Sequence, residues 1–294
     1  MKSKYIVELG ISEHANKIPS ALGEIPIFFG YMLEISERAN RKDLIKMFNI
    51  LIWSDEMISQ LKEKGIRFEN GVAVIPEKFI YQDKVSMIST YKYRNDIPDR
   101  LKSTSLLAYF MPDDNLFNRI RKLETEIPIM KEYGGICGFD LSPSVGMLRP
   151  RQRFSILINS IFNTYCGSCG VKILPNSRVG DLGTMSMTGS FPNGMDYITG
   201  KHGCNSYGFK EYGLYQLCLQ IHEKQPHILY VYGNVSLKEA RVLFRYSKNV
   251  NFNIITFPDR RNRVRNKAQP HRICIENGRI VKKIFEYGGS EDEC

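Results

Sequence analysis

The sequence lacks any apolar stretch long enough to cross a membrane. No uninterrupted apolar run approaches the roughly 18–20 residues that a membrane span requires. The start also lacks the pattern of a secretory signal, because Glu8 interrupts the apolar run at residues 5–9 and no small-residue cleavage site follows. We therefore expect a protein that stays in the cytoplasm and has no membrane partner.

Several motifs that would identify a reaction are also missing. There is no glycine-rich phosphate loop of the Walker or dinucleotide type, no paired-histidine motif of the rolling-circle nucleases and no zinc-protease motif. The glycine-rich stretch at residues 167–170 has no lysine and precedes a predicted strand, which is the wrong context for a phosphate loop. The sequence alone therefore does not reveal a reaction.

Cysteine is present, but not in a disulfide pattern. The seven cysteines are an odd number, and several lie among apolar residues, as is typical of small buried side chains in a cytoplasmic protein. Cys166 and Cys169 form a Cys-x-x-Cys pair at the end of a predicted helix, where the helix dipole opposes thiolate formation and disfavours redox chemistry. A zinc site would need two further ligands, for which Cys137, Cys204 and His202 are candidates.

The charge of the chain is unbalanced. It has 41 Lys and Arg residues against 31 Asp and Glu residues, a net charge of +10. Such an excess attracts polyanions such as nucleic acid or nucleotides, although many soluble proteins are simply rich in basic residues. The densest basic run is predicted to be a loop that contacts phosphate groups, and the alternative is a solvated loop without a partner. It contains Arg260, Arg261, Arg263, Arg265 and Lys267.

Six short apolar runs predict the fold. Each is too short for a helix, and the later ones are rich in β-branched or aromatic residues, as strands are. Helical patterns lie between most of them, including apolar side chains at i, i+3 and i+4 across residues 154–165 and a capping box that begins at Ser236. The order predicts an α/β protein with a mainly parallel sheet of about six strands and helical crossovers, either an open sheet or a partial barrel. The runs are residues 106–110, 136–139, 171–174, 197–199, 228–232 and 252–257.

The two flanking parts are less regular. Residues 39–61 contain apolar residues at helical spacing, and Asn70-Gly71 predicts the tight turn of a hairpin. A second Asn-Gly hairpin is predicted across residues 273–281, before a short acidic tail. We expect three parts: an N-terminal α+β segment over residues 1–100, a parallel βα core over 101–258, and a basic loop, hairpin and tail over 259–294.

Five stretches occur in an order that resembles a known family. They are residues 108–114, 135–142, 170–181, 201–204 and 228–233, and the most specific is Lys-Ile-Leu-Pro-Asn-x-Arg-x-Gly-Asp at residues 172–181. Together they resemble, over residues 107–233, the family catalogued as domain of unknown function 4417, found in phages, plasmids and prokaryotic chromosomes. Members often carry Trp where Val179 stands here, so an aromatic platform of the relatives is missing at that position. The resemblance implies a mobile-element setting, and the host cytoplasm if the chain is phage-encoded, but no mechanism.

Polar residues follow nearly every predicted strand. In open parallel sheets, ligands bind beyond the carboxyl ends of the strands. Asp140, Asp181 and His202 are therefore candidates for general acid–base catalysis or for holding a divalent metal, and Arg178 for binding phosphate. The alternative is a structural role, since turns and helix caps also favour polar residues, and Asp113 in particular is expected to cap a helix.

Two functions of different classes are consistent with these patterns. The first is a mobile-element protein that binds nucleic acid or another polyanion, with metal-dependent phosphoester chemistry at the strand ends as an option. The alternative is a non-enzymatic phage protein that binds and inhibits a host defence or replication protein. A deep polar pocket in which two or three carboxylates converge would favour the first function, and burial of surface in an oligomer would favour the second. The most useful single observation is whether Asp140, Asp181 and His202 converge within hydrogen-bonding reach.

Overall fold

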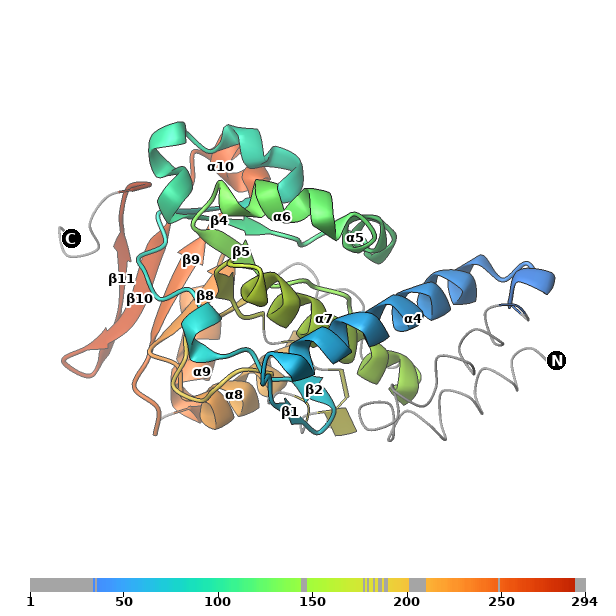
Figure 1. Cartoon of the computed structure of the whole chain (residues 1–294). Coiled ribbons are helices and arrows are strands. Elements are labelled where there is room, and N and C mark those ends of the chain that lie inside the picture. The colour runs from blue at the N-terminus through green and yellow to red at the C-terminus, as the bar shows by residue number, and fades with distance from the viewer. Residues whose placement is uncertain are drawn as a thin grey trace.

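The structure of the protein, a computed structural model, is an α/β arrangement in which helices pack around β-sheets (Figure 1). It describes residues 34, 36–143, 147–176, 178, 180–181, 183–184, 187, 190–200, 210–247 and 249–288. Within these residues, no helix combines the length and the apolar character needed to span a membrane.

The first large sheet has four parallel strands in the order β3-β4-β5-β6. Parallel neighbours cannot be joined by a tight hairpin, so helical segments connect them. The strands are β3 (Met87–Thr90), β4 (Ser105–Ala108), β5 (Gly135–Cys137) and β6 (Ile173–Leu174). The connections are the 3₁₀ helices η2 (Tyr91–Asp96) and η3 (Asp99–Thr104), then α5 (Asp113–Ile120) and α6 (Leu123–Lys131), then α7 (Arg149–Ser168).

The second large sheet has five strands in the order β11-β10-β9-β8-β7 and is mixed. β7, β8 and β9 run parallel, whereas β10 is antiparallel to both β9 and β11. The strands are β7 (Tyr197–Gly200), β8 (Ile228–Tyr232), β9 (Asn253–Phe257), β10 (His271–Glu276) and β11 (Arg279–Ile284). The helices of this half are α8 (Lys210–Lys224), α9 (Leu237–Tyr246) and α10 (Arg260–Asn266).

The two large sheets meet at the end of β6. Asn176 forms a parallel bridge with Ile198 of β7, and the Ile198 N–H donates to the Pro175 carbonyl at 2.8 Å. Because this bridge is parallel, the carboxyl ends of β3 to β9 point the same way. One face of each sheet contributes to a shared apolar cluster. Its members include Leu106, Cys137, Leu174, Ile198, Tyr230 and Phe257.

The α/β class and the helical crossovers are confirmed, and all six predicted runs form strands. The expectation of about six parallel strands in one sheet is wrong, because the runs are divided between two sheets. The physical reason lies at β6, which has two residues and is followed by Pro175, a residue with no N–H for a continued ladder. β3, which the pattern of residues 87–90 did not reveal, and the antiparallel β10 and β11 extend the two sheets.

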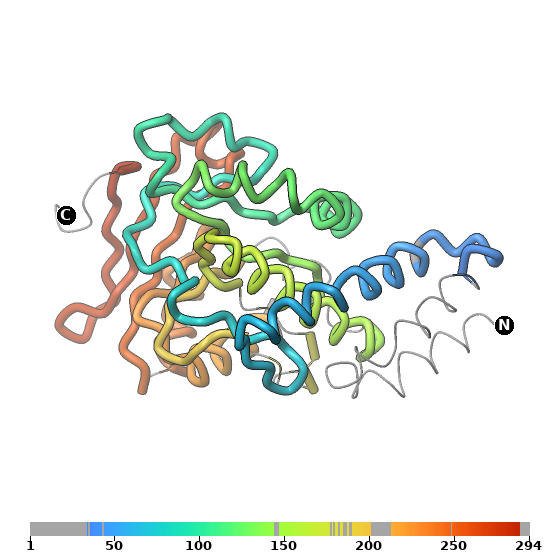
Figure 2. Tube along the Cα trace, viewed as in Figure 1, coloured from blue at the N-terminus to red at the C-terminus, as the bar shows by residue number. Residues whose placement is uncertain are grey.

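The N-terminal part packs against the first sheet. Helix α4 (Lys42–Glu63) confirms the helical pattern there and lies alongside α7 in the Cα trace (Figure 2), where the ring centroids of Trp53 and Phe162 are 5.2 Å apart. The predicted hairpin is also confirmed, with β1 (Phe68–Glu69) antiparallel to β2 (Val72–Ala73). Asn70 and Gly71 form its turn with φ angles of 46° and 90°. The short 3₁₀ helix η1 (Glu77–Phe79) follows.

The C-terminal basic run forms a helix, α10, so the expectation of a loop is wrong. Asp259 caps the helix because its Oδ1 accepts a hydrogen bond from the Asn262 N–H at 2.9 Å. Lys267 ends the helix in the left-handed region, with φ of 50°. The second Asn-Gly hairpin is confirmed by the pairing of β10 with β11.

We predict that His271 makes stability depend on pH. Its ring is buried in β10, with Thr256 Oγ1 2.8 Å from Nδ1. Burial, together with the charge of Lys282, lowers its pKa to about 4. Between pH 4 and 6.5 the unfolded chain therefore binds more protons at this residue, so stability falls as pH decreases through that range. The loss from this group is on the order of 3 kcal/mol at most. Urea unfolding from pH 4 to 7 should show a flatter dependence for His271→Gln, and equal slopes for both proteins would contradict the prediction.

Candidate functional site

Two asparagines of α7 hold the segment that follows β5. Asn163 Oδ1 accepts a hydrogen bond from the Phe139 N–H at 2.7 Å, and Asn159 makes two bonds to the Leu141 backbone, at 2.9 and 3.0 Å. Asn159 and Asn163 are four residues apart and therefore share one face of the helix. Their bonds fix the backbone on both sides of Asp140, which is buried.

Gly138 permits this close approach between the segment and α7. A Cβ at this position would lie 2.7 Å from Asn163 Nδ2, a distance that Cβ atoms do not adopt without displacement of the neighbour. Any larger residue would push the β5 exit away from the amide that binds Phe139. Gly138 is therefore part of the site through its missing side chain.

Asp140 and Arg178 form a buried ion pair across neighbouring strand exits. Arg178 Nη1 donates to Asp140 Oδ2, and each side chain is only 8% exposed. The other carboxylate oxygen, Asp140 Oδ1, is buried and has no hydrogen-bond partner among the residues that the structure describes. Desolvation makes an incompletely satisfied buried charge costly, so the pair is held in place by the surrounding structure.

Asp113 adds a second carboxylate from the exit of β4. It is the first residue of α5, and its Oδ1 accepts a hydrogen bond from the Ser142 N–H at 3.2 Å. Burial raises the pKa of this carboxyl group; the Ser142 hydrogen bond and the charge of Arg178 oppose the increase, and the charge of Asp140 adds to it. Asp113 therefore links α5 to the β5 exit, and the carboxyl ends of β4, β5 and β6 converge on one charged cluster.

Asp181 lies in a turn that is attached to α7. Gln152 donates from Nε2 to Asp181 Oδ2 at 2.8 Å, and its Oε1 accepts from the Asp181 N–H at 2.6 Å. The Asp181 carbonyl accepts from the Thr184 N–H at 2.8 Å. Gly180 allows this contact, since a Cβ there would lie 1.8 Å from Gln152 Oε1. These bonds give Asp181 a definite structural role in the turn.

The predicted catalytic set is thus placed in part. Asp140 contacts Arg178, whereas Asp181 is bound by Gln152, and His202 lies outside the described residues. Within the described part of the chain, no group of three or more His, Cys, Asp or Glu side chains is arranged to hold a metal ion. The polar side chains of the site form the Asp140–Arg178 ion pair and a network of amide hydrogen bonds, rather than a set of metal ligands.

The sequence patterns did not single out Asn159, Asn163 or Gln152. One signal could have found them: amide side chains occur inside the apolar pattern of α7, at positions where that pattern does not predict an exposed face. Gln152 and Asn163 are both buried, and buried amides require hydrogen-bond partners. The partner of Asn163 lies earlier in the chain, after β5, and the partner of Gln152 lies later, after β6. The sequence could therefore indicate that these amides need partners, but not which residues the partners are.

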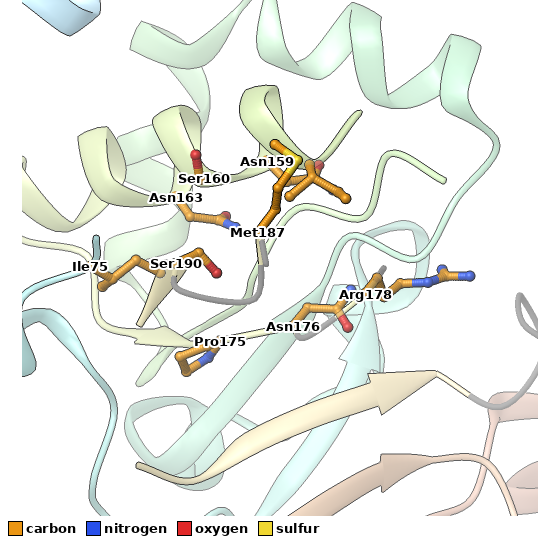
Figure 3. Close-up of a pocket in the computed structure, with 10 residues that line it drawn as sticks. Ile75, Asn159, Ser160, Asn163, Pro175, Asn176, Arg178, Met187 and Ser190 are labelled. Atoms are coloured by element: carbon orange, nitrogen blue, oxygen red, sulfur yellow. The ribbon is translucent and has the colours of Figure 1, made fainter. Parts of the chain in front are cut away.

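A narrow polar pocket lies between α7 and the segment that follows β6 (Figure 3). Asn159 and Asn163 line it from the helix, and Asn176 and Arg178 line it from the strand exit. Both amide atoms of Asn176 are buried and have no hydrogen-bond partner in the described structure. Arg178 both lines the pocket and pairs with Asp140, so the pocket lies next to the charged cluster.

The residues of the basic run fall into two groups. Arg260 Nε donates to Asp96 Oδ2 at 2.9 Å and its guanidinium lies 4.0 Å from the centre of the Tyr93 ring, while Arg263 Nη2 is 3.5 Å from the same carboxylate. These contacts hold α10 against η2. The other group is exposed and forms no ion pair with any described carboxylate. It consists of Arg261, Arg265 and Lys267.

The Cys-x-x-Cys pair ends α7, as predicted. Cys166 is buried, and burial raises the pKa of its thiol well above the usual range. Gly167 between the cysteines packs against Phe79, because a Cβ there would lie 2.7 Å from the Phe79 ring. The possible ligand Cys137 is also buried, with its thiol pKa raised by desolvation, while Cys204 lies outside the described residues. Cys166 is therefore part of a packed helix end and is unsuited to thiolate chemistry.

Fold and site together define an α/β protein with a polar, charged site at the carboxyl ends of parallel strands. The chain belongs to the family described as a domain of unknown function (DUF4417), whose model matches residues 67–249. This confirms the resemblance noted from the sequence. The matched region includes Asp113, Asp140, Arg178 and Asp181, whereas α10 lies beyond it. No curated protein and no solved structure matches the chain.

We predict strong coupling between Asp140 and Arg178. Removing one partner leaves the other charge buried, so Asp140→Leu or Arg178→Met alone should lower the free energy of unfolding by about 3–5 kcal/mol. The double variant buries no charge at this position and should lose much less than the sum of the two. Urea unfolding of the four proteins measures the coupling directly. Additive effects would show that the two side chains do not depend on each other.

Proposed function

We propose that this chain is a mobile-element protein that binds nucleic acid or another polyanion through the exposed face of α10. The observation that supports the proposal is the division of the basic run. Arg260 and Arg263 bind Asp96 and hold the helix, which leaves Arg261, Arg265 and Lys267 exposed without an ion-pair partner in the described structure. Neighbouring like charges on a short helix repel one another, and a bound polyanion would remove that repulsion.

The position of α10 also favours binding. The helix begins three residues after β9 and therefore lies at the carboxyl end of the parallel strands, the same end as Asp140 and Arg178. Ligands of parallel α/β sheets bind at this end. The net charge of +10 would attract a polyanion over a longer range and increase the rate of association.

Changing Arg261, Arg265 and Lys267 together to Gln should weaken binding to short DNA and RNA oligonucleotides. Each lost phosphate contact should reduce the slope of log K against log salt by about 0.7–0.9, or roughly 2–3 for the triple variant. Fluorescence anisotropy at several salt concentrations measures both the affinity and the slope. The three side chains are exposed, so the melting temperature should stay close to that of the unchanged protein.

The matched control removes the same three charges elsewhere. Lys42, Lys62 and Lys122 are exposed residues of α4 and of the turn before α6. Their replacement by Gln should leave the salt slope nearly unchanged. Equal losses in both triple variants would mean that net charge alone, and no particular surface, attracts the ligand. The absence of any binding at low salt would refute the proposal and favour the inhibitor of a host protein.

A metal-dependent phosphoester reaction at the strand ends is the second candidate. The observation that favours it is Asp140 Oδ1, a buried carboxylate oxygen with no hydrogen-bond partner in the described structure. Carboxylate oxygens are the ligands that Mg²⁺ and Mn²⁺ prefer. Under this candidate, either ion should raise the melting temperature of the protein, and the increase should disappear in Asp140→Asn but persist in Asp99→Asn, whose side chain is 93% exposed. No increase at millimolar metal would exclude the candidate.

A further inference from the structure

The side chain of Arg260 is held by two contacts and is still accessible. Its Nε donates to Asp96 Oδ2 at 2.9 Å, and its Cζ lies 4.0 Å from the centre of the Tyr93 ring. Even so, 41% of the side chain is exposed, and its charged end is not buried. Arg260 therefore has a fixed direction and a surface that a ligand can reach.

The two contacts determine which surface of Arg260 is left. A guanidinium group is flat, with its N–H donors at the edge of the plane and a face on either side. The hydrogen bond to Asp96 uses part of the edge, and the Tyr93 ring covers one side of the group. The exposed surface therefore lies on the side away from the ring.

This support distinguishes Arg260 from the other cations of α10. Ordering a long side chain costs conformational entropy, and that cost is paid on binding when the side chain is mobile before the ligand arrives. Arg260 is already ordered by its two contacts with η2. The cations without an ion-pair partner in the described structure have no such support. They are Arg261, Arg265 and Lys267.

The surroundings of Arg260 favour a flat, uncharged group over a phosphate. Asp96 lies at the edge of the guanidinium, where a phosphate would bind, and its negative charge repels a second anion there. The side away from Tyr93 has no such carboxylate bonded to it in the described structure. Unpaired bases stack on guanidinium planes as they do on aromatic rings. Bases inside a duplex are already stacked on their neighbours, so their faces are covered.

We infer that an unpaired nucleobase stacks on the exposed side of the Arg260 guanidinium, while the three exposed cations of α10 bind the phosphates of the same strand. The inference rests on the proposed nucleic-acid binding and adds that the ligand is single-stranded. Arg260 contacts the ligand, whereas Tyr93 and Asp96 are positioning residues. Every base has a flat face, so the contact distinguishes single strands from duplexes more than one base from another.

The test separates stacking from charge by comparing strands that carry the same phosphates. The first probe is a single strand of deoxyadenosine about eight nucleotides long, a length within the usual range of single-strand sites. The second has the same length and the same phosphates, but abasic sugars throughout. The third is a duplex of mixed sequence. Fluorescence anisotropy at several salt concentrations gives the affinity and the salt slope for each probe.

The unchanged protein should bind the strand with bases at least about fivefold more tightly than the abasic strand, the low end of what one stacked base contributes. Arg260→Lys keeps the charge and can still pair with Asp96, but it has no flat face. It should therefore lose this difference without a change in salt slope, and it should weaken binding of the single strand more than binding of the duplex.

Two further proteins control for charge and for loss of an arginine. The triple α10 variant, in which Arg261, Arg265 and Lys267 are changed to Gln, should bind both single strands more weakly and keep the ratio between them. Arg67→Lys changes an exposed arginine of the chain before β1 that pairs with Glu69. It should keep the difference between the strand with bases and the abasic strand.

Variants of Tyr93 test whether the ring has more than a structural role. Tyr93→Leu removes the ring that supports Arg260 and should reduce the difference between the strand with bases and the abasic strand. Tyr93→Phe keeps a ring and should retain more of that difference than Tyr93→Leu. Tyr93 is partly exposed, and the melting temperature of each variant checks that it is folded. If Tyr93→Leu weakens binding of both strands equally, the ring only holds α10 in place and the inference is overturned.

Each contrary outcome has a distinct meaning. Equal binding of the two single strands by the unchanged protein would overturn the stacking inference and leave the α10 proposal intact. A difference between them that persists in Arg260→Lys would also overturn it, because the bases would then contact another surface. No binding of any probe at low salt would refute the proposed function and the inference with it.

Discussion

The site depends on hydrogen bonds from the amide side chains of α7 to the segments that follow β5 and β6. Asn163 and Asn159 bind the backbone of Phe139 and Leu141, and Gln152 binds both the backbone and the carboxylate of Asp181. These segments leave regular strands and would otherwise bury unpaired N–H groups. The helix replaces the missing strand ladder and so determines where each exit segment runs.

The positions of the charged groups follow from this attachment. With the backbone held on both sides of it, Asp140 meets Arg178 from the next strand exit, and Ser142 reaches Asp113 at the start of α5. Gly138 and Gly180 are required where the chain passes closest to the amides of α7. An ion pair this deeply buried contributes little net stability, so its retention is better explained by the arrangement that it maintains at the strand ends.

Two kinds of charged group with different physical properties lie at this end of the molecule. Exposed cations such as Arg261, Arg265 and Lys267 of the basic run act at long range and are screened by salt. The buried pair of Asp140 and Arg178 has little contact with solvent, so salt screens it much less.

The local elements could be predicted from the amino-acid sequence, because their signals lie within a few neighbouring residues. Short apolar runs identified six strands and helical spacing identified α4, and the Asn70-Gly71 turn and the Ser236 capping box were correct. The division into two sheets and the partners of the polar residues became known from the folded chain alone. Those partners are distant in the chain: Asn163 binds Phe139 across 24 positions and Arg260 binds Asp96 across 164. A buried amide or charge requires a partner, but which one it meets depends on how the whole chain packs.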